Sequence, residues 1–139
     1  MEKWQRLMKT GNEHYQMKQW EEAIYHYNQS ITLLEDQEFL TGKDSLQSIQ
    51  AWVCGYHNLA KTYEQQGLIQ RCRDMLIIPF MKLNNISNQP YASPEMQLTI
   101  HRSLKVTLLP LLTFANNYPN ESQFIDQLLK DINNPQSIH

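Results

Sequence analysis

Apolar residues recur at intervals of three and four along most of this chain, which indicates helices with one buried face. The first such segment spans residues 2–17, and a turn is expected at 17–19 before a second helix over 20–35. In the first helix the repeating positions are Trp4, Leu7, Met8, Gly11 and Tyr15. In the second they are Ala23, Ile24, Tyr27, Ile31 and Leu34.

A break in the pattern separates these two helices from a longer third helix. Residues 36–43 predict a connection, after which Asp44 or Ser45 is suited to cap the next helix with a side-chain oxygen. That helix is predicted to reach Gln66, where Gly67 is a typical C-terminal residue. Its apolar stripe consists of Ile49, Trp52, Val53, Tyr56, Leu59, Ala60 and Tyr63.

The fourth predicted helix spans 69–83 and is apolar nearly all round between Met75 and Phe80. Such a helix is expected to be covered on most of its surface. Pro79 has no amide hydrogen and clashes with the preceding turn, so a kink or an early stop is expected there. Residues 84–92 predict a loop.

A helix start is clear at Ser93, because Pro94 follows at the first helical position. This fifth helix is predicted to reach Ala115, with a second kink at Pro110. A turn at 116–119 follows it.

The last helix is predicted to begin after a cap at Asn120 or Ser122 and to end near residue 133, and residues 134–139 are expected to fray. No segment predicts a strand. The chain therefore predicts an all-α fold of six helices in three antiparallel pairs. Its 139 residues suit a single domain with its own core.

The first helix pair resembles a tetratricopeptide repeat. The resemblance rests on one small residue in each helix, Gly11 and Ala23. Trp20 stands at the turn position and Tyr27 at the aromatic position that follows. In this family the small residues let two helix backbones cross closely, and the aromatic side chains fill the space beside the crossing. The resemblance implies a right-handed α-solenoid of helix pairs.

A second match to the same pattern lies in the middle of the chain, at Tyr56, Leu59, Ala60, Tyr63, Gly67, Cys72 and Leu76. Gly11 and Ala60 are 49 residues apart, whereas the family period is about 34. The third pair lacks the signature and is expected to be a divergent repeat or a cap. The predicted units of the single domain, 1–139, are 2–35, 44–83 and 93–133. A generic antiparallel helix bundle is the alternative.

The resemblance also implies a concave groove, formed by fixed positions on the first helix of each unit. In the first unit these positions are Gln5, Met8, Asn12, Tyr15 and Gln16. In the second unit they are Cys54, His57, Lys61, Glu64 and Gln65. A lining with many amides and few charges suits an extended peptide or a helix. The alternative is that these side chains are merely solvated.

Two groove types are known in this family. One holds the terminal carboxylate of a peptide with Lys and Asn. Asn12 matches one of its positions, but Met8 stands where that clamp has Lys, which disfavours it. The other type is the small, acidic secretion chaperone with three repeats. The size and charge of this chain fit that class, but its third repeat fits poorly.

The net charge of −2 offers no excess of Lys and Arg for binding a nucleic-acid backbone. The N-terminal segment has no apolar signal-peptide core, and no run approaches the roughly 18 apolar residues of a membrane helix. Two cysteines do not make a disulfide scaffold. We therefore expect a cytoplasmic protein that binds neither nucleic acid nor membrane.

Candidate chemistry is limited to Cys54 and His57, which share one helical face. Zinc would need two further ligands, and only Cys72 is a candidate. A Cys–His nucleophile would need an oxyanion hole and an orienting residue, and no motif supplies them. We expect no metal, no cofactor and no enzymatic activity.

The sequence thus predicts an adaptor that binds a protein or peptide partner in its groove. A small secretion-type or assembly chaperone is an alternative. The apolar segments 75–83 and 106–114 leave two further possibilities open, since they either cover each other or form a patch that drives self-association, for example as a homodimer.

Overall fold

A computed structural model describes residues 1–36, 45–89 and 93–133. Within these ranges every regular element is a helix and there is no strand, which confirms the all-α prediction. The elements are α1 (Lys3–Gln16), α2 (Trp20–Asp36), α3 (Ser45–Gln65), α4 (Ile69–Ser87), α5 (Pro94–Asn117), the 3₁₀-helix η1 (Pro119–Glu121) and α6 (Gln123–Asn133). No described helix has both the length and the apolar content that a bilayer crossing requires.

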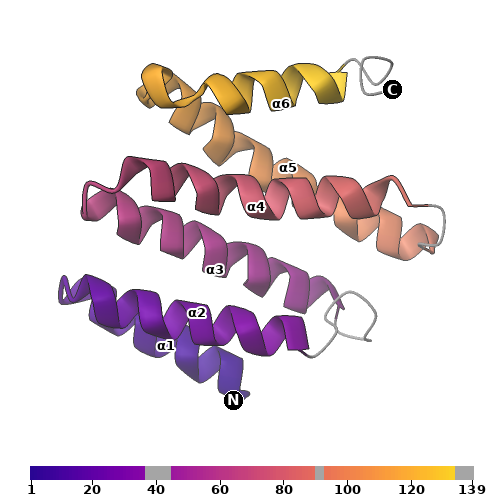
Figure 1. Ribbon diagram of the computed structural model, residues 1–139. Helices are drawn as coiled ribbons and strands as arrows, with labels where there is room; N and C mark the ends of the chain where they lie inside the picture. The colour runs from indigo at the N-terminus through magenta and orange to yellow at the C-terminus, as the bar shows by residue number, and fades with distance from the viewer. Residues whose placement is uncertain (37–44, 90–92, 134–139) are drawn as a thin grey trace.

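Successive helices run in opposite directions and stack in chain order from α1 to α6 (Figure 1). Each of the first five packs against the next, and α3 also contacts α5, although a whole helix lies between them in sequence. This second contact brings α3 and α5 together along one side of α4, where the candidate site lies.

Local signals place the helix boundaries. Glu2 and Gln5 form a capping box at the start of α1. The hydroxyl of Ser93 accepts a hydrogen bond of 3.1 Å from the amide of Met96, as predicted for the start of α5. Gly67 has a φ of +77° between α3 and α4, which confirms its role as the residue that ends α3.

The two internal prolines do not end their helices. The early stop considered at Pro79 is wrong, because α4 continues to Ser87 and takes in part of the predicted loop. Pro110 likewise lies inside α5, which reaches Asn117. Burial of the apolar residues around Pro79 stabilises α4 and offsets the roughly 3 kcal/mol that a proline costs inside a helix.

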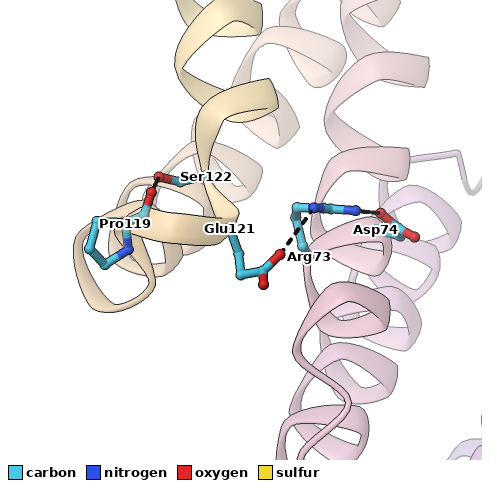
Figure 2. A network of polar contacts seen from close by, with 5 residues as sticks. All are labelled: Arg73, Asp74, Pro119, Glu121 and Ser122. Atoms are coloured by element: carbon cyan, nitrogen blue, oxygen red, sulfur yellow. Dashed lines mark hydrogen bonds and ion pairs between the residues drawn. The ribbon is translucent and has the colours of Figure 1, made fainter.

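The predicted turn at 116–119 is also corrected, because Asn117 is still helical and η1 begins at Pro119. Ser122 directly precedes α6, and its hydroxyl donates a 3.0 Å hydrogen bond back to the carbonyl of Pro119 (Figure 2). Ser45 is the first residue of α3 itself. The predictions for 37–43, Asp44 and 134–139 lie outside the described residues.

Gly11 marks a close approach between α1 and α2. A Cβ atom at this position would lie 2.7 Å from two ring carbons of Tyr27, which is 2% exposed. The Tyr27 hydroxyl donates a 2.7 Å hydrogen bond to Oδ1 of Asn12 and so fixes the ring across α1. The need for a small residue at Gly11 therefore comes from the ring of Tyr27, beside a fully buried Ala23.

A second close approach, between α2 and α3, has no counterpart in the sequence prediction. It lies at Gly55, where a Cβ atom would be 2.8 Å from Cγ1 of Ile31. Met8 of α1 reaches the same point with its terminal methyl group. The first helix pair is thus fitted against α3 as closely as its own two helices fit each other.

Two apolar clusters fill the interior. The first joins α2 and α3 and includes Leu83 of α4 and Ile100 of α5, with Trp52 fully buried at its centre. The second joins α4, α5 and α6 through Phe80, Phe114 and Ile125, among others. At the edge of the second cluster Arg73 lies between two carboxylates, 3.2 Å from Asp74 and 3.6 Å from Glu121 (Figure 2). Burial in these clusters is the main stabilising contribution.

Candidate functional site

The surface between α3 and α5 is hollowed in two adjoining places, which together we call the α3–α5 groove. The first hollow has a volume of about 510 Å³ and is lined by Leu46, Gln50, Val53, Cys54, His57, Asn58, Lys61, Arg102, Ser103 and Val106. The second has a volume of about 420 Å³ and is lined by His57, Ala60, Lys61, Glu64, Cys72, Leu76, Leu109, Pro110, Thr113, Phe114 and Asn117.

His57 and Lys61 line both hollows, so the two are parts of one groove. The α3 side runs from Leu46 to Glu64, which at 1.5 Å per residue is a length of about 27 Å. At about 3.3 Å per residue, the groove is long enough for about eight residues of an extended polypeptide.

Four of the five positions predicted for the second unit lie in this groove. Cys54, His57, Lys61 and Glu64 are all lining residues, whereas Gln65 lines neither hollow. They share the groove face because α3 is one uninterrupted helix and they recur on it at intervals of three and four.

The five positions predicted for the first unit are not among the lining residues of the groove. Gln5 accepts the amide of Glu2 in the capping box at 2.7 Å. Met8 and Asn12 contact other helices, as described for Gly55 and Tyr27. Tyr15 meets the ring of Trp20 edge to face, with centroids 5.1 Å apart, and Gln16 is the last residue of α1. Gln5, Met8, Asn12 and Tyr15 thus each contact other parts of the fold.

The other wall of the groove comes from α5, and none of its residues was a predicted site residue. Val106 and Leu109 are 59% and 68% exposed, more than any other large apolar side chain of α5. Thr113 and Asn117 continue the same face toward the end of α5. Positions 106, 109, 113 and 117 recur at intervals of three and four, so they share one face of the helix. This periodicity was the signal in the sequence that could have identified the wall.

The charges in the groove are unevenly distributed. Lys61 and Arg102 line the first hollow, which has no acidic lining residue. Neither cation forms an ion pair with a carboxylate among the described residues. At the other end, Glu64 accepts a 2.8 Å hydrogen bond from the hydroxyl of Tyr118. The first hollow therefore carries two cations and no carboxylate, whereas the second carries Glu64 together with Lys61.

His57 lies at the junction of the two hollows. Its Nε2 atom is buried and has no hydrogen-bond partner among the described residues. Burial, and secondarily the charge of Lys61, lower the pKa of His57 below its ordinary value of 6.5. The imidazole is therefore neutral at pH 7.

This environment predicts a pH dependence of stability. The pKa of His57 is lower in the folded than in the unfolded state, so below about pH 6.5 the unfolded state binds more protons. The wild-type protein should lose stability as the pH falls through that window, and His57→Gln should lose less. Urea unfolding at about pH 7.5 and pH 5 measures the difference, and an equal loss in both proteins would contradict the account.

The two thiols lie in different environments. Burial, together with the charge of Glu64, raises the pKa of Cys72 to about 12, so this thiol stays protonated at neutral pH. Cys54 is exposed, and its Sγ lies 3.7 Å from Nδ2 of Asn58. In the described part of the chain, no group of three or more His, Cys, Asp or Glu side chains is placed to hold a metal ion.

Apolar and polar side chains thus lie side by side along an open groove. No curated protein and no solved structure is significantly similar to the chain. A family model described as a protein of unknown function, DUF2753, matches residues 2–138, and the chain belongs to that family.

Proposed function

We propose that this chain is a non-enzymatic adaptor that binds a segment of another protein in the α3–α5 groove. The observation that carries the proposal is the exposed apolar wall of α5, where Val106 and Leu109 face the amide and charged side chains of α3. An apolar surface rimmed by polar groups is typical of a site that a partner covers. The proposal includes the cytoplasmic location expected from the sequence.

The proposal also includes a tetratricopeptide-like arrangement. In that arrangement the first helix of each pair contributes to one concave surface. Two features support it here: the close contact of α1 and α2 at Gly11, and the contact of α3 with α5, which are the first helices of the second and third pairs. The third pair then contributes one wall of the groove, although it lacks the sequence signature.

A matched pair of variants tests the proposal. Leu109→Glu places a charge on the apolar wall of the groove, and Phe124→Glu makes the same kind of change at a residue of α6 that is 53% exposed and outside the groove. In affinity capture from the native host with quantitative mass spectrometry, partners of the wild type should be lost about tenfold or more with Leu109→Glu and retained with Phe124→Glu. Equal capture by both variants would contradict the proposal.

Self-association is a second candidate, since apolar side chains outside the groove remain exposed on the predicted apolar segments. Ile78, Met81 and Leu112 are 37%, 43% and 46% exposed, although α4 and α5 pack together over much of their length. A homodimer or an assembly chaperone would use such a patch. Light scattering that shows a monomer at high protein concentration would remove this candidate.

A further inference from the structure

Building on the proposed function, we infer that the α3–α5 groove selects an internal protein segment that combines an acidic and an apolar side chain. The carboxylate of an Asp or Glu would lie in the first hollow with Lys61 and Arg102. The apolar side chain would enter the second hollow beside Leu76 and Leu109.

The positive charge of the first hollow is the reason to expect an acidic residue in the partner segment. The whole chain has a net charge of −2, yet this hollow has two cations and no carboxylate among its lining residues. Lys61 and Arg102 are both exposed and pair with no carboxylate of the described chain, so an acidic side chain of the ligand would complement their charge. The guanidinium group of Arg102 can bind a carboxylate through two parallel hydrogen bonds.

The apolar surface of the second hollow is the reason to expect an apolar residue in the partner segment. Its floor is formed by buried residues, with Leu76 7% and Phe114 3% exposed, and Ala60 adds little volume. Leu109 stands at its edge with most of its side chain in solvent. A leucine, isoleucine or phenylalanine of the partner would bury this surface, as the central residue of an interface commonly does.

The ends of the groove indicate an internal segment and not a chain terminus. Beyond the two cations the first hollow continues along α3 to Leu46 and Gln50, which leaves a path for the polypeptide to pass through. The opposite end carries the carboxylate of Glu64, which would repel a terminal carboxylate.

The groove also determines the spacing between the acidic and the apolar residue of the partner segment. Arg102 and Leu109 are seven residues apart on α5, which corresponds to about 10 Å along the helix. An extended strand advances about 3.3 Å per residue, so the acidic and apolar residues should be about three positions apart.

A random dodecapeptide display library selected on the purified full-length protein tests the inference. The expected result is enrichment of Asp or Glu about three positions from Leu, Ile, Met or Phe. The strongest sequence, synthesised with a fluorescent label and an amidated C-terminus, should bind in fluorescence anisotropy. Loss of binding on amidation would overturn the assignment to an internal segment.

Charge reversal in the groove tests the need for an acidic residue, and the same reversal outside the groove is the control. The double variant Lys61→Glu and Arg102→Glu should weaken binding of the acidic peptide at least tenfold. Lys9→Glu with Lys105→Glu makes the same change in net charge outside the groove and should leave it within about twofold. A peptide with Lys in place of its acidic residue should prefer the reversed groove.

The possible failures are distinguishable. If Leu109→Glu selects the same peptides as the wild type, no ligand depends on the groove, and both the proposed function and this inference are overturned. If peptides depend on Leu109 but show no preference for acidic residues, or are unaffected by charge reversal, only the inference on the chemistry of the partner is overturned.

Discussion

Replacing Trp52 by alanine should lower the free energy of unfolding by about 3–5 kcal/mol. Trp52 is fully buried in the first cluster, where it meets Tyr56 edge to face at a centroid distance of 5.2 Å. Its indole Nε1 donates a 3.0 Å hydrogen bond to Glu35 of α2. The variant leaves a cavity between helices and removes this bond. Urea unfolding followed by far-UV circular dichroism measures the loss.

A graded control separates the two contributions of this residue. Trp52→Phe keeps an aromatic ring in the cluster but removes the Nε1 donor, so its loss should be clearly smaller than that of Trp52→Ala. A loss below about 1 kcal/mol for Trp52→Ala would mean that this side chain is not at the centre of the core.

Replacing Gly11 by valine should also destabilise the protein, by about 2–3 kcal/mol. Even a single Cβ atom would lie 2.7 Å from the Tyr27 ring, and the two γ-methyl groups of valine add to that clash. The ring has little freedom to move, because it is 2% exposed and its hydroxyl is bonded to Asn12. Thermal and urea unfolding of the variant measure the effect.

The companion variants show whether Tyr27 causes the loss. Gly11→Ala should cost less than valine, because the gain in helix propensity of about 1 kcal/mol offsets part of the clash. In the background of Tyr27→Leu, where the ring is absent, Gly11→Val should cost much less. Additive losses in the double variant would contradict the assigned contact.

Most of the fold could be predicted from the sequence, since its helices carry strong local signals. Amphipathic periodicity locates the helices, and Ser93 and Gly67 mark two boundaries by the chemistry of their side chains or backbone. The continuation of α4 through Pro79 was missed because it depends on tertiary burial, which a local rule does not include.

The candidate site was only half predictable. The resemblance to a repeat signature pointed to Cys54, His57 and Lys61, and these three residues line the α3 side of the groove. The opposite wall belongs to a pair without that signature, and its register against α3 is fixed by three-dimensional packing. Arg102 therefore gave no sign of a site from the sequence, and Leu109 stood out only as part of the apolar segment 106–114, which was considered for self-association.

The central claim is that a partner segment binds between α3 and α5. Methyl-labelled NMR of the full chain, titrated with the peptide selected from the display library, tests it most directly. We predict that the methyl signals of Val106, Leu109 and Leu76 shift on binding, while those of Ile24 and Leu33 on α2 stay in place. Shifts confined to α1 and α2, or to the exposed faces of α4 and α6, would contradict the account.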